Sequence, residues 1–262
     1  MKVVILAGGL GTRISEESHL KPKPMIDIGK YPILVHIMRI YATQGFKDFV
    51  ICGGYKQNVI KEYFSNFDVY MNDVTFDFAS GERVLHDRPK FDWRVTVANT
   101  GLKTQTGGRI RRVSRYLNNE PFMLAYGDAV GDIDINAVLE SHKKSGKLAT
   151  ICVYSYAQSK GVVDIDKDGS VKSFREKSKS DNDVINIGYM VLQPEVIDMI
   201  KSDEDSFEQV VLPELARQGQ LNAYLHKGFW QCMDTIREKQ ILEELDSKPD
   251  CPWKVWYKKA NK

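Results

Sequence analysis

The chain of 262 residues has few cysteines and almost no excess charge, and each of these two features excludes some classes of function. Its four cysteines form no CxxC pair, which argues against a zinc site or a redox pair. We expect them to be reduced thiols in a cytoplasmic protein. The formal net charge of +2 is too small for a protein whose main partner is a nucleic acid.

Long apolar runs are also missing. No stretch approaches the ~20 apolar residues that a membrane-spanning helix needs, so no membrane partner is expected. The start of the chain superficially resembles a signal peptide, but its apolar stretch stops at Ala7. A secretory core needs about 7–15 apolar residues, which again favours a cytoplasmic location. Internal repeats, low-complexity tracts and linkers are absent, so we expect one domain over residues 1–262.

Short apolar stretches alternate with helical patterns along most of the chain. This alternation predicts an α/β fold of Rossmann-like type, with a mixed, mainly parallel sheet flanked by helices. Buried strands are expected at residues 2–6, 47–54, 121–128 and 148–156, with a further strand and helix over 185–200. Helices are expected at residues 32–44, 58–64, 106–117, 135–146, 207–220 and 236–245. Residues 162–177 have the pattern of a hairpin that turns on Asp168 and Gly169.

Residues 65–100 depart from this alternation. They contain β-type stretches around Gly81 and no clear helix, which predicts a β-rich insertion carrying a hairpin. The insertion has more aromatic residues than a free surface loop: Tyr70, Phe76, Phe78, Phe91 and Trp93. We therefore expect it to pack at a subunit interface, with an intramolecular flap over the substrate as the alternative. Residues 247–262, rich in Lys, Pro and Trp, form a C-terminal tail.

A glycine-rich stretch, LAGGLGTRI, follows the first strand at residues 6–14. Glycines at a strand end let backbone amides approach an anionic ligand closely. A dinucleotide fingerprint would need its third glycine where Ile14 stands, and no register supplies a P-loop. What remains is a glycine turn followed by Thr12 and Arg13, whose forked cation suits phosphate oxygens. A plain tight turn is the alternative.

The segment KPKPM, at residues 21–25, places two lysines beside prolines. Prolines hold the chain extended, and a lysine on a rigid segment loses less entropy when it meets a phosphate. Taken alone, such a segment favours the simpler interpretation, a proline-containing solvated loop. Its occurrence shortly after the glycine turn favours a phosphate site.

Together, LAGGLGTR and KPKPM resemble the signature of the nucleotidyltransferases that make nucleotide sugars. The stretches NDVTF, TGGRIRRV, YGDAVGDIDI and GFWQCMDTIREK are similar to those of the bacterial glucose-1-phosphate cytidylyltransferases, and the likeness spans residues 1–256. The resemblance implies the nucleotide-diphospho-sugar transferase fold. It also implies a Mg²⁺-dependent reaction of CTP with a sugar 1-phosphate, α-D-glucose 1-phosphate in that family, giving a CDP-sugar and pyrophosphate. Family members are homo-oligomers, and a hexamer is expected.

The same resemblance implies roles for individual residues. Lys23 is expected to bridge the reacting phosphates as the main catalytic residue, and Arg13 to stabilise the leaving pyrophosphate. Asp128 and Asp234 are expected to hold Mg²⁺, which prefers oxygen ligands. A turn cap for Asp128 and a helix N-cap for Asp234 are the alternatives. Nucleotide contacts are expected from two glycine segments: Leu6, Ala7, Gly8, Gly9, Gly11, Thr12 and Arg13, then Thr106, Gly107, Gly108 and Arg109.

The acceptor side departs from the family pattern. Sugar-phosphate contacts are expected from Gly161, Glu176, Lys177, Asn186 and Gly188. Differences from the relatives at Ala129, Ser178, Ile187 and residues 154–160 leave the acceptor open. A same-fold enzyme for dTTP or UTP, or for another phosphorylated acceptor, is therefore an alternative. A noncatalytic nucleotide-sugar-binding homologue is a further alternative, disfavoured because Lys23, Asp128 and Asp234 are all present.

Overall fold

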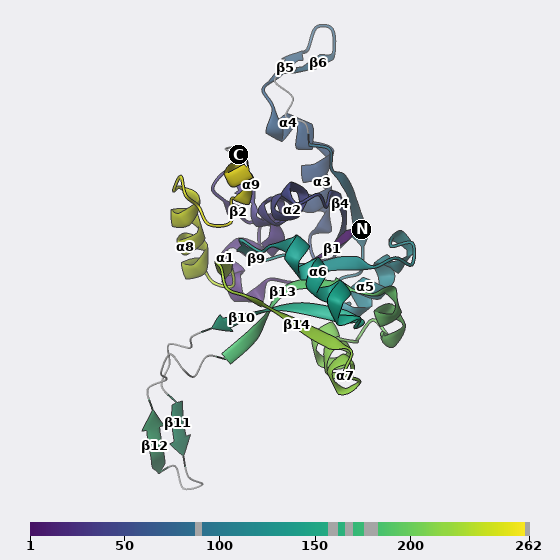
Figure 1. The fold of residues 1–262 in the computed structure, drawn as a ribbon. Coiled ribbons are helices and arrows are strands. Elements are labelled where there is room, and N and C mark those ends of the chain that lie inside the picture. The colour runs from purple at the N-terminus through teal and green to yellow at the C-terminus, as the bar shows by residue number, and fades with distance from the viewer. Residues whose placement is uncertain (87–90, 157–161, 166–169, 176–182, 260–262) are drawn as a thin grey trace.

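A mixed seven-stranded sheet forms the centre of the computed structural model, which describes residues 1–86, 91–156, 162–165, 170–175 and 183–259 (Figure 1). The strand order is β14-β10-β13-β8-β1-β4-β7. The strands are β1 (Val3–Ala7), β4 (Asp48–Gly53), β7 (Arg94–Asn99), β8 (Phe122–Tyr126), β10 (Ala149–Tyr156), β13 (Asp183–Leu192) and β14 (Leu221–His226). Only β13 runs antiparallel to its neighbours in this sheet, so the predicted mainly parallel sheet is confirmed.

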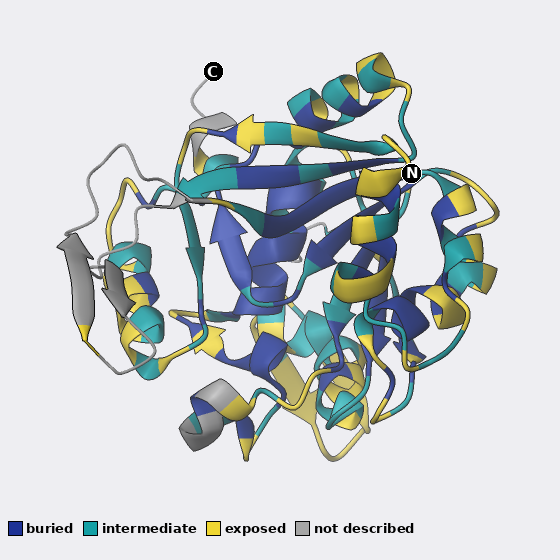
Figure 2. Cartoon of the chain, turned by 90° about the horizontal axis from the view of Figure 1, so that it is seen from below, coloured by how far each residue is buried: buried dark blue, intermediate teal, exposed yellow. Residues whose placement is uncertain are grey.

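The central strands are apolar on both faces because helices cover both sides of the sheet. Along β1, Val3 and Ile5 enter one core, while Val4 enters the other. The first core also receives α2 (Ile33–Thr43), α3 (Gln57–Ser65), α6 (Ile135–Ser145) and α8 (Ile236–Asp246). The second receives α5 (Thr106–Val113) and α7 (Leu212–Arg217). Figure 2 shows the buried strands between these two layers.

Short elements surround the sheet. They are η1 (Thr12–Ile14), α1 (Ser15–Ser18), η2 (Lys23–Met25), β2 (Asp27–Ile28), β3 (Tyr31–Pro32), η3 (Ser114–Tyr116), β9 (Ala129–Gly131), η4 (Pro194–Met199) and β15 (Trp230–Cys232). The helix expected over 207–220 begins with one π-helical turn, η5 (Phe207–Val211), and continues as α7. The hairpin expected over 162–177 is present as β11 (Val162–Ile165) and β12 (Val171–Arg175); its turn at Asp168 and Gly169 lies outside the described residues.

The structure corrects two details of the insertion at 65–100. It contains a helix, α4 (Phe67–Met71), and its last strand, β7, pairs with β4 as the edge of the central sheet. Phe91 and Trp93 pack against Phe67 within the same chain. Aromatic packing onto the sheet therefore outweighs the β-type pattern of this segment.

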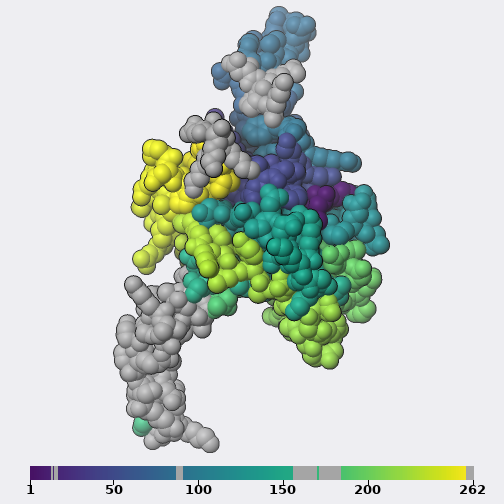
Figure 3. Space-filling view, viewed as in Figure 1, coloured from purple at the N-terminus to yellow at the C-terminus, as the bar shows by residue number. Residues whose placement is uncertain are grey.

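The expected hairpin is formed by β5 (Val74–Asp77) and β6 (Glu82–Leu85). It extends away from the body of the protein (Figures 1 and 3). Phe76 and Phe78 on this hairpin are 50% and 94% exposed. An isolated two-stranded hairpin is at best marginally stable in water.

The C-terminal tail packs onto the body through Trp253, which is fully buried. The Trp253 indole N–H donates to His36 Nδ1 at 3.2 Å, and His36 Nε2 lies 3.0 Å from the Ile28 carbonyl oxygen. Because an indole nitrogen only donates, Nδ1 is the acceptor and Nε2 carries the proton. The neutral imidazole thus ties α2 to the segment before α9 (Val255–Lys259).

We predict that this contact makes the fold sensitive to acid. Burial lowers the pKa of His36 from 6.5 to about 4, although the Ile28 carbonyl and the Asp246 carboxylate oppose the shift. Protonation is therefore more favourable in the unfolded chain, and stability falls as the pH drops from 6.5 towards 4. The free energy of unfolding should decrease by about 2 kcal/mol between pH 7 and pH 5 through this group alone.

Urea unfolding at the two pH values, of wild type and His36→Gln, measures this loss. Glutamine can accept from Trp253 and donate to Ile28 without titrating, so the variant should lose about 2 kcal/mol less than wild type. Equal losses in the two proteins would contradict the prediction. His142, whose pKa is lowered by burial, contributes equally to both proteins and cancels in the comparison.

The structure also shows the state of the cysteines and the character of the helices. All four cysteines are free, and three of them are buried. Within the described ranges, no helix combines the length and apolar character needed to span a bilayer.

Candidate active site

A pocket of about 320 Å³ opens where β1 and β8 end. These strands are parallel neighbours, with Leu6 opposite Tyr126, so the loops that follow them emerge side by side. Ligands bind outside the carboxyl ends of strands in open α/β sheets. Because β13 runs antiparallel, its early residue Asn186 reaches the same edge. The pocket is lined by Leu6, Ala7, Gly8, Gly9, Gly11, Lys23, Pro24, Thr104, Gln105, Thr106, Arg109, Tyr126, Gly127, Asp128 and Glu208.

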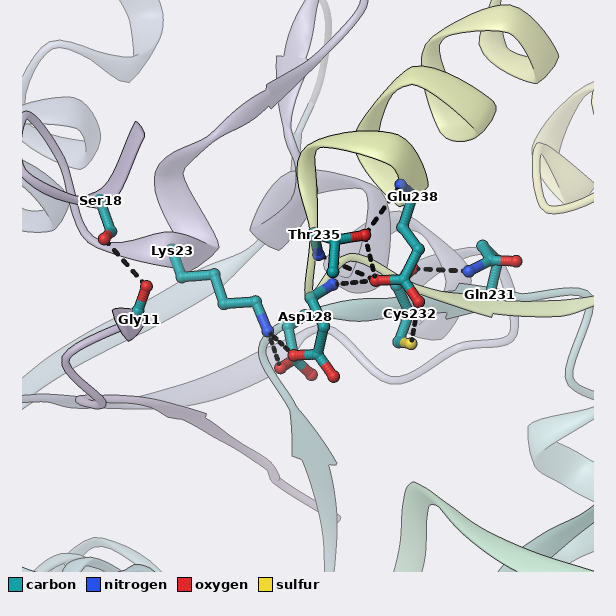
Figure 4. Close-up of polar contacts among 9 residues, drawn as sticks. Gly11, Ser18, Lys23, Asp128, Gln231, Cys232, Thr235 and Glu238 are labelled. Atoms are coloured by element: carbon teal, nitrogen blue, oxygen red, sulfur yellow. Dashed lines mark hydrogen bonds and ion pairs between the residues drawn. The ribbon is translucent and has the colours of Figure 1, made fainter. Parts of the chain in front are cut away.

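Lys23 joins the two predicted metal-binding aspartates. Its Nζ lies 2.6 Å from Asp128 Oδ2 and 2.5 Å from Asp234 Oδ1, and Figure 4 shows the ammonium group between the two carboxylates. The lysine itself is only 8% exposed. Burial by itself would lower the pKa of Lys23, but attraction and hydrogen bonds from Asp128 and Asp234 outweigh it and raise the pKa. A permanently charged ammonium therefore faces the pocket.

Asp234 is not the N-cap of the helix that follows it. Thr235 takes that position, and Glu238 accepts the backbone N–H groups of both Asp234 and Thr235, forming a capping box (Figure 4). The Asp234 carboxylate is thereby turned towards Lys23. Likewise, Asp128 does not serve only as a turn residue, because its carboxylate meets the same ammonium.

The two aspartates supply the oxygen ligands that a hard divalent cation such as Mg²⁺ prefers. Two carboxylates converging on one cation is an arrangement that Mg²⁺ accepts, with waters and substrate phosphates completing its octahedron. In the part of the chain that is described, no group of three or more His, Cys, Asp or Glu side chains gathers as a metal cage. The residues thus fit a metal shared with a phosphate ligand.

Arg109 contacts the backbone of the glycine loop. Its guanidinium donates to the carbonyl oxygens of Gly8 at 2.9 Å and Gly101 at 2.7 Å, and to the Thr100 hydroxyl at 2.7 Å. A Cβ atom at Gly8 would lie 2.2 Å from this guanidinium, so only glycine permits the contact. Arg109 also lines the pocket, and its predicted nucleotide contact stays a prediction.

The other predicted nucleotide residues differ in where they lie relative to the pocket. Leu6, Ala7, Gly8, Gly9, Gly11 and Thr106 line the pocket. Gly107 and Gly108 do not. They are buried against the backbone of Asp205 and Asp203, and the Gly108 amide donates to Asp205 O at 3.3 Å. Thr12 lies exposed in η1; the Arg13 side chain lies outside the described residues.

Fewer acceptor-side predictions can be placed. Gly161, Glu176 and Lys177 lie outside the described residues, as does Ser178. Asn186 donates through Nδ2 to the Tyr126 hydroxyl at 3.3 Å and accepts the Gly188 N–H at 3.0 Å. Gly188 has φ +78°, and a Cβ atom there would lie 2.5 Å from the Tyr126 ring. Asn186 and Gly188 thus meet beside a residue of the pocket.

The predictions omitted several residues that line the pocket, notably Tyr126 and Glu208. Tyr126 ends a predicted buried strand, so its position at the sheet edge could have been inferred. Glu208 gives no such signal, because it stands at the start of a helical segment far from the glycine loop in sequence. Only the packing of η5 against α5 brings it to the site.

Comparisons with known proteins identify the family of the chain. A family model described as nucleotidyl transferase matches residues 2–237. The chain is 50% identical to the glucose-1-phosphate cytidylyltransferase of Salmonella typhimurium over 257 residues, covering 98% of this chain and 100% of that protein. It is 38% identical to a probable glucose-1-phosphate cytidylyltransferase of Bacillus subtilis, with the same coverage. The predicted resemblance is confirmed.

A solved structure supports the fold. The crystal structure of HddC from Yersinia pseudotuberculosis superimposes with a TM-score of 0.68 at 26% identity, covering 93% of this chain and 98% of that one.

Proposed function

The chain belongs to the nucleotidyl transferase family, and on that premise we propose that it is a cytidylyltransferase acting on CTP and α-D-glucose 1-phosphate. A phosphate oxygen of the sugar phosphate attacks the α-phosphorus of CTP. The bond from the α-phosphorus to the bridging oxygen breaks, and CDP-glucose and pyrophosphate are formed. The full-length identity of 50% to a protein named for this reaction carries the proposal.

The residues of the pocket suit this chemistry. Both reactants are anions that repel each other, so catalysis depends on positioning and charge neutralisation. The amides of the glycine loop can bind phosphate oxygens, and the Lys23 ammonium can lie between the two reacting phosphates. Arg13 is proposed to hold the pyrophosphate as it leaves. A charged lysine held by two carboxylates is already oriented before substrate arrives, which limits the entropy lost on binding.

Nucleotidyl transferases of this family generally use a divalent metal, and we propose Mg²⁺ for this chain. Asp128 and Asp234 would hold it. When bound, the ion supplies positive charge to the triphosphate. The two carboxylates otherwise remain paired with Lys23, so they keep their positions in its absence.

The acceptor is the open part of the proposal. Gly161, Glu176, Lys177, Asn186 and Gly188 are proposed to bind the sugar phosphate, with Glu176 on hydroxyl groups and Lys177 on the phosphate. The sequence differs from its relatives at Ala129, Ser178 and Ile187, so another hexose 1-phosphate is the alternative that the following experiment separates.

Pyrophosphate release, measured with CTP, dTTP and UTP against a panel of sugar 1-phosphates, tests the proposal. We expect the highest kcat/KM for CTP with α-D-glucose 1-phosphate. A higher value with dTTP or UTP would overturn the choice of nucleotide. A higher value with another sugar would overturn the choice of acceptor. Absence of pyrophosphate with every pair would mean that the chain binds nucleotide sugar without reacting.

We further propose that the β5–β6 hairpin packs against a second copy of the chain in a homo-oligomer, as a hexamer. Its exposed Phe76 and Phe78 support this, and so does its position away from the body (Figure 3). None of its residues lines the pocket, which disfavours an intramolecular flap.

Replacing both Phe76 and Phe78 with serine should therefore reduce the solution mass from an oligomer to the single-chain 29.9 kDa, because the apolar contact is lost. Light scattering coupled to gel filtration measures this mass. Tyr257→Ser, which removes a ring that is 55% exposed elsewhere, is the matched control and should leave the mass unchanged. A wild-type protein with the mass of a single chain would overturn the proposal.

A further inference from the structure

Glu208 stands in the pocket at the junction of the two sides of the site. Its carboxylate accepts the hydroxyl hydrogens of Thr106 at 2.5 Å and Ser206 at 2.9 Å on Oε2, and of Tyr126 at 2.6 Å on Oε1. Thr106 begins α5 on the proposed nucleotide side. Tyr126 leads to the proposed acceptor side.

The acceptor role of the Glu208 carboxylate fixes the direction of this hydrogen-bond chain. A carboxylate only accepts, so Tyr126 must donate its single hydroxyl hydrogen to Glu208. The Tyr126 oxygen then presents lone pairs to Asn186, whose Nδ2 donates at 3.3 Å. The Asn186 amide is therefore oriented with Oδ1 towards the Gly188 N–H, which donates at 3.0 Å.

Further contacts restrict how the hydroxyl groups of Thr106 and Tyr126 can be oriented. Thr106 Oγ1 also accepts the Phe207 N–H at 2.9 Å, so its hydrogen is directed to Glu208. Gly188 packs against the Tyr126 ring, which leaves that ring little room to turn.

We propose that Glu208 is a positioning residue that orients both substrate sides of the pocket, through Thr106 on the nucleotide side and through Tyr126 and Asn186 on the acceptor side. This rests on the proposed function. Glu208 touches neither reacting phosphate in this role. It fixes the groups that do the binding.

Steady-state kinetics of three variants tests the proposal through a split in KM. Tyr126→Phe should raise KM for the sugar phosphate about tenfold and leave KM for CTP within about twofold, because only one branch is cut. Thr106→Val should do the reverse. Glu208→Ala should raise both KM values about tenfold, and adding Tyr126→Phe to it should raise KM for the sugar phosphate no further.

Glu208→Gln separates orientation from charge. The glutamine carbonyl can still accept from Tyr126, but its NH2 group takes the place of the oxygen that accepts from Thr106, so this variant should keep KM for the sugar phosphate within about threefold of wild type and raise KM for CTP. If Gln raises KM for the sugar phosphate as much as Ala does, Glu208 acts through its charge and the proposal is wrong. KM changes for one substrate only in Glu208→Ala would also overturn it.

Glu214→Ala is the matched control. Glu214 likewise accepts from several side chains, those of Arg217 and Gln218, but lies outside the pocket, and its loss should leave both KM values unchanged. Turnover of the wild type is measured first. No turnover by wild type would reject the proposed function, whereas normal wild-type turnover with no KM split would reject the role of Glu208 alone.

Discussion

Lys23→Ala is expected to lower kcat by about 100- to 1,000-fold, the range seen when one preorganised stabilising group is removed from a transition state. The ammonium is buried, its pKa is raised, and it is held by two carboxylates at 2.5 and 2.6 Å, so no mobile surface lysine can replace it. Pyrophosphate release under saturating substrates measures the loss.

The control for this prediction is Lys143→Ala, which removes an exposed lysine that pairs with Glu140 on α6. It should leave kcat unchanged. Thermal unfolding of both variants establishes that they fold, because Lys23→Ala also leaves two carboxylates facing each other without their cation. A kcat for Lys23→Ala within about tenfold of wild type, roughly 1.4 kcal/mol of barrier, would refute the catalytic assignment.

Asp128→Asn and Asp234→Asn are each expected to lower kcat by about 100-fold or more, and the double variant should be little worse than either single one. The reason is that both carboxylates converge on one point, so losing either spoils the same proposed metal site. An amide keeps the size of the side chain but withdraws a negative charge that Mg²⁺ and Lys23 both use.

Activity as a function of Mg²⁺ concentration measures this effect, and chelation should abolish wild-type turnover. Each single variant should need a higher Mg²⁺ concentration for half-maximal rate. The exposed Asp250, changed to Asn, is the matched control. If the losses of the two single variants multiply in the double variant, the aspartates act independently and the shared site is wrong.

Much of the fold could be inferred from local patterns. Buried strands and amphipathic helices have periodicities that a short window reveals, so β1, α2, β4, β8 and α6 were all predicted close to their observed positions. The insertion was harder, because aromatic residues suit both a strand and a helix that packs on a sheet. Hence α4 was missed, and the edge strand β7 was assigned to the insertion.

The candidate site could be inferred in part. The glycine loop directly follows the first strand and Lys23 comes shortly after that loop, so their order along the chain already suggests a shared edge. Asp128 follows a strand in the same way. The role of Arg109 could not be read from its basic neighbours, because the carbonyl oxygens that it binds come from two separate loops.

By itself, the sequence determined the alternation of strands and helices, the glycine turn, the family resemblance and the residue types available for phosphate chemistry. Only the tertiary structure decided that Lys23 bridges Asp128 and Asp234, and that Glu208 joins Thr106 to Tyr126. Local order follows from the preferences of neighbouring residues, whereas these contacts join positions far apart along the chain. They exist because strand order and helix packing bring the segments to one edge of the sheet.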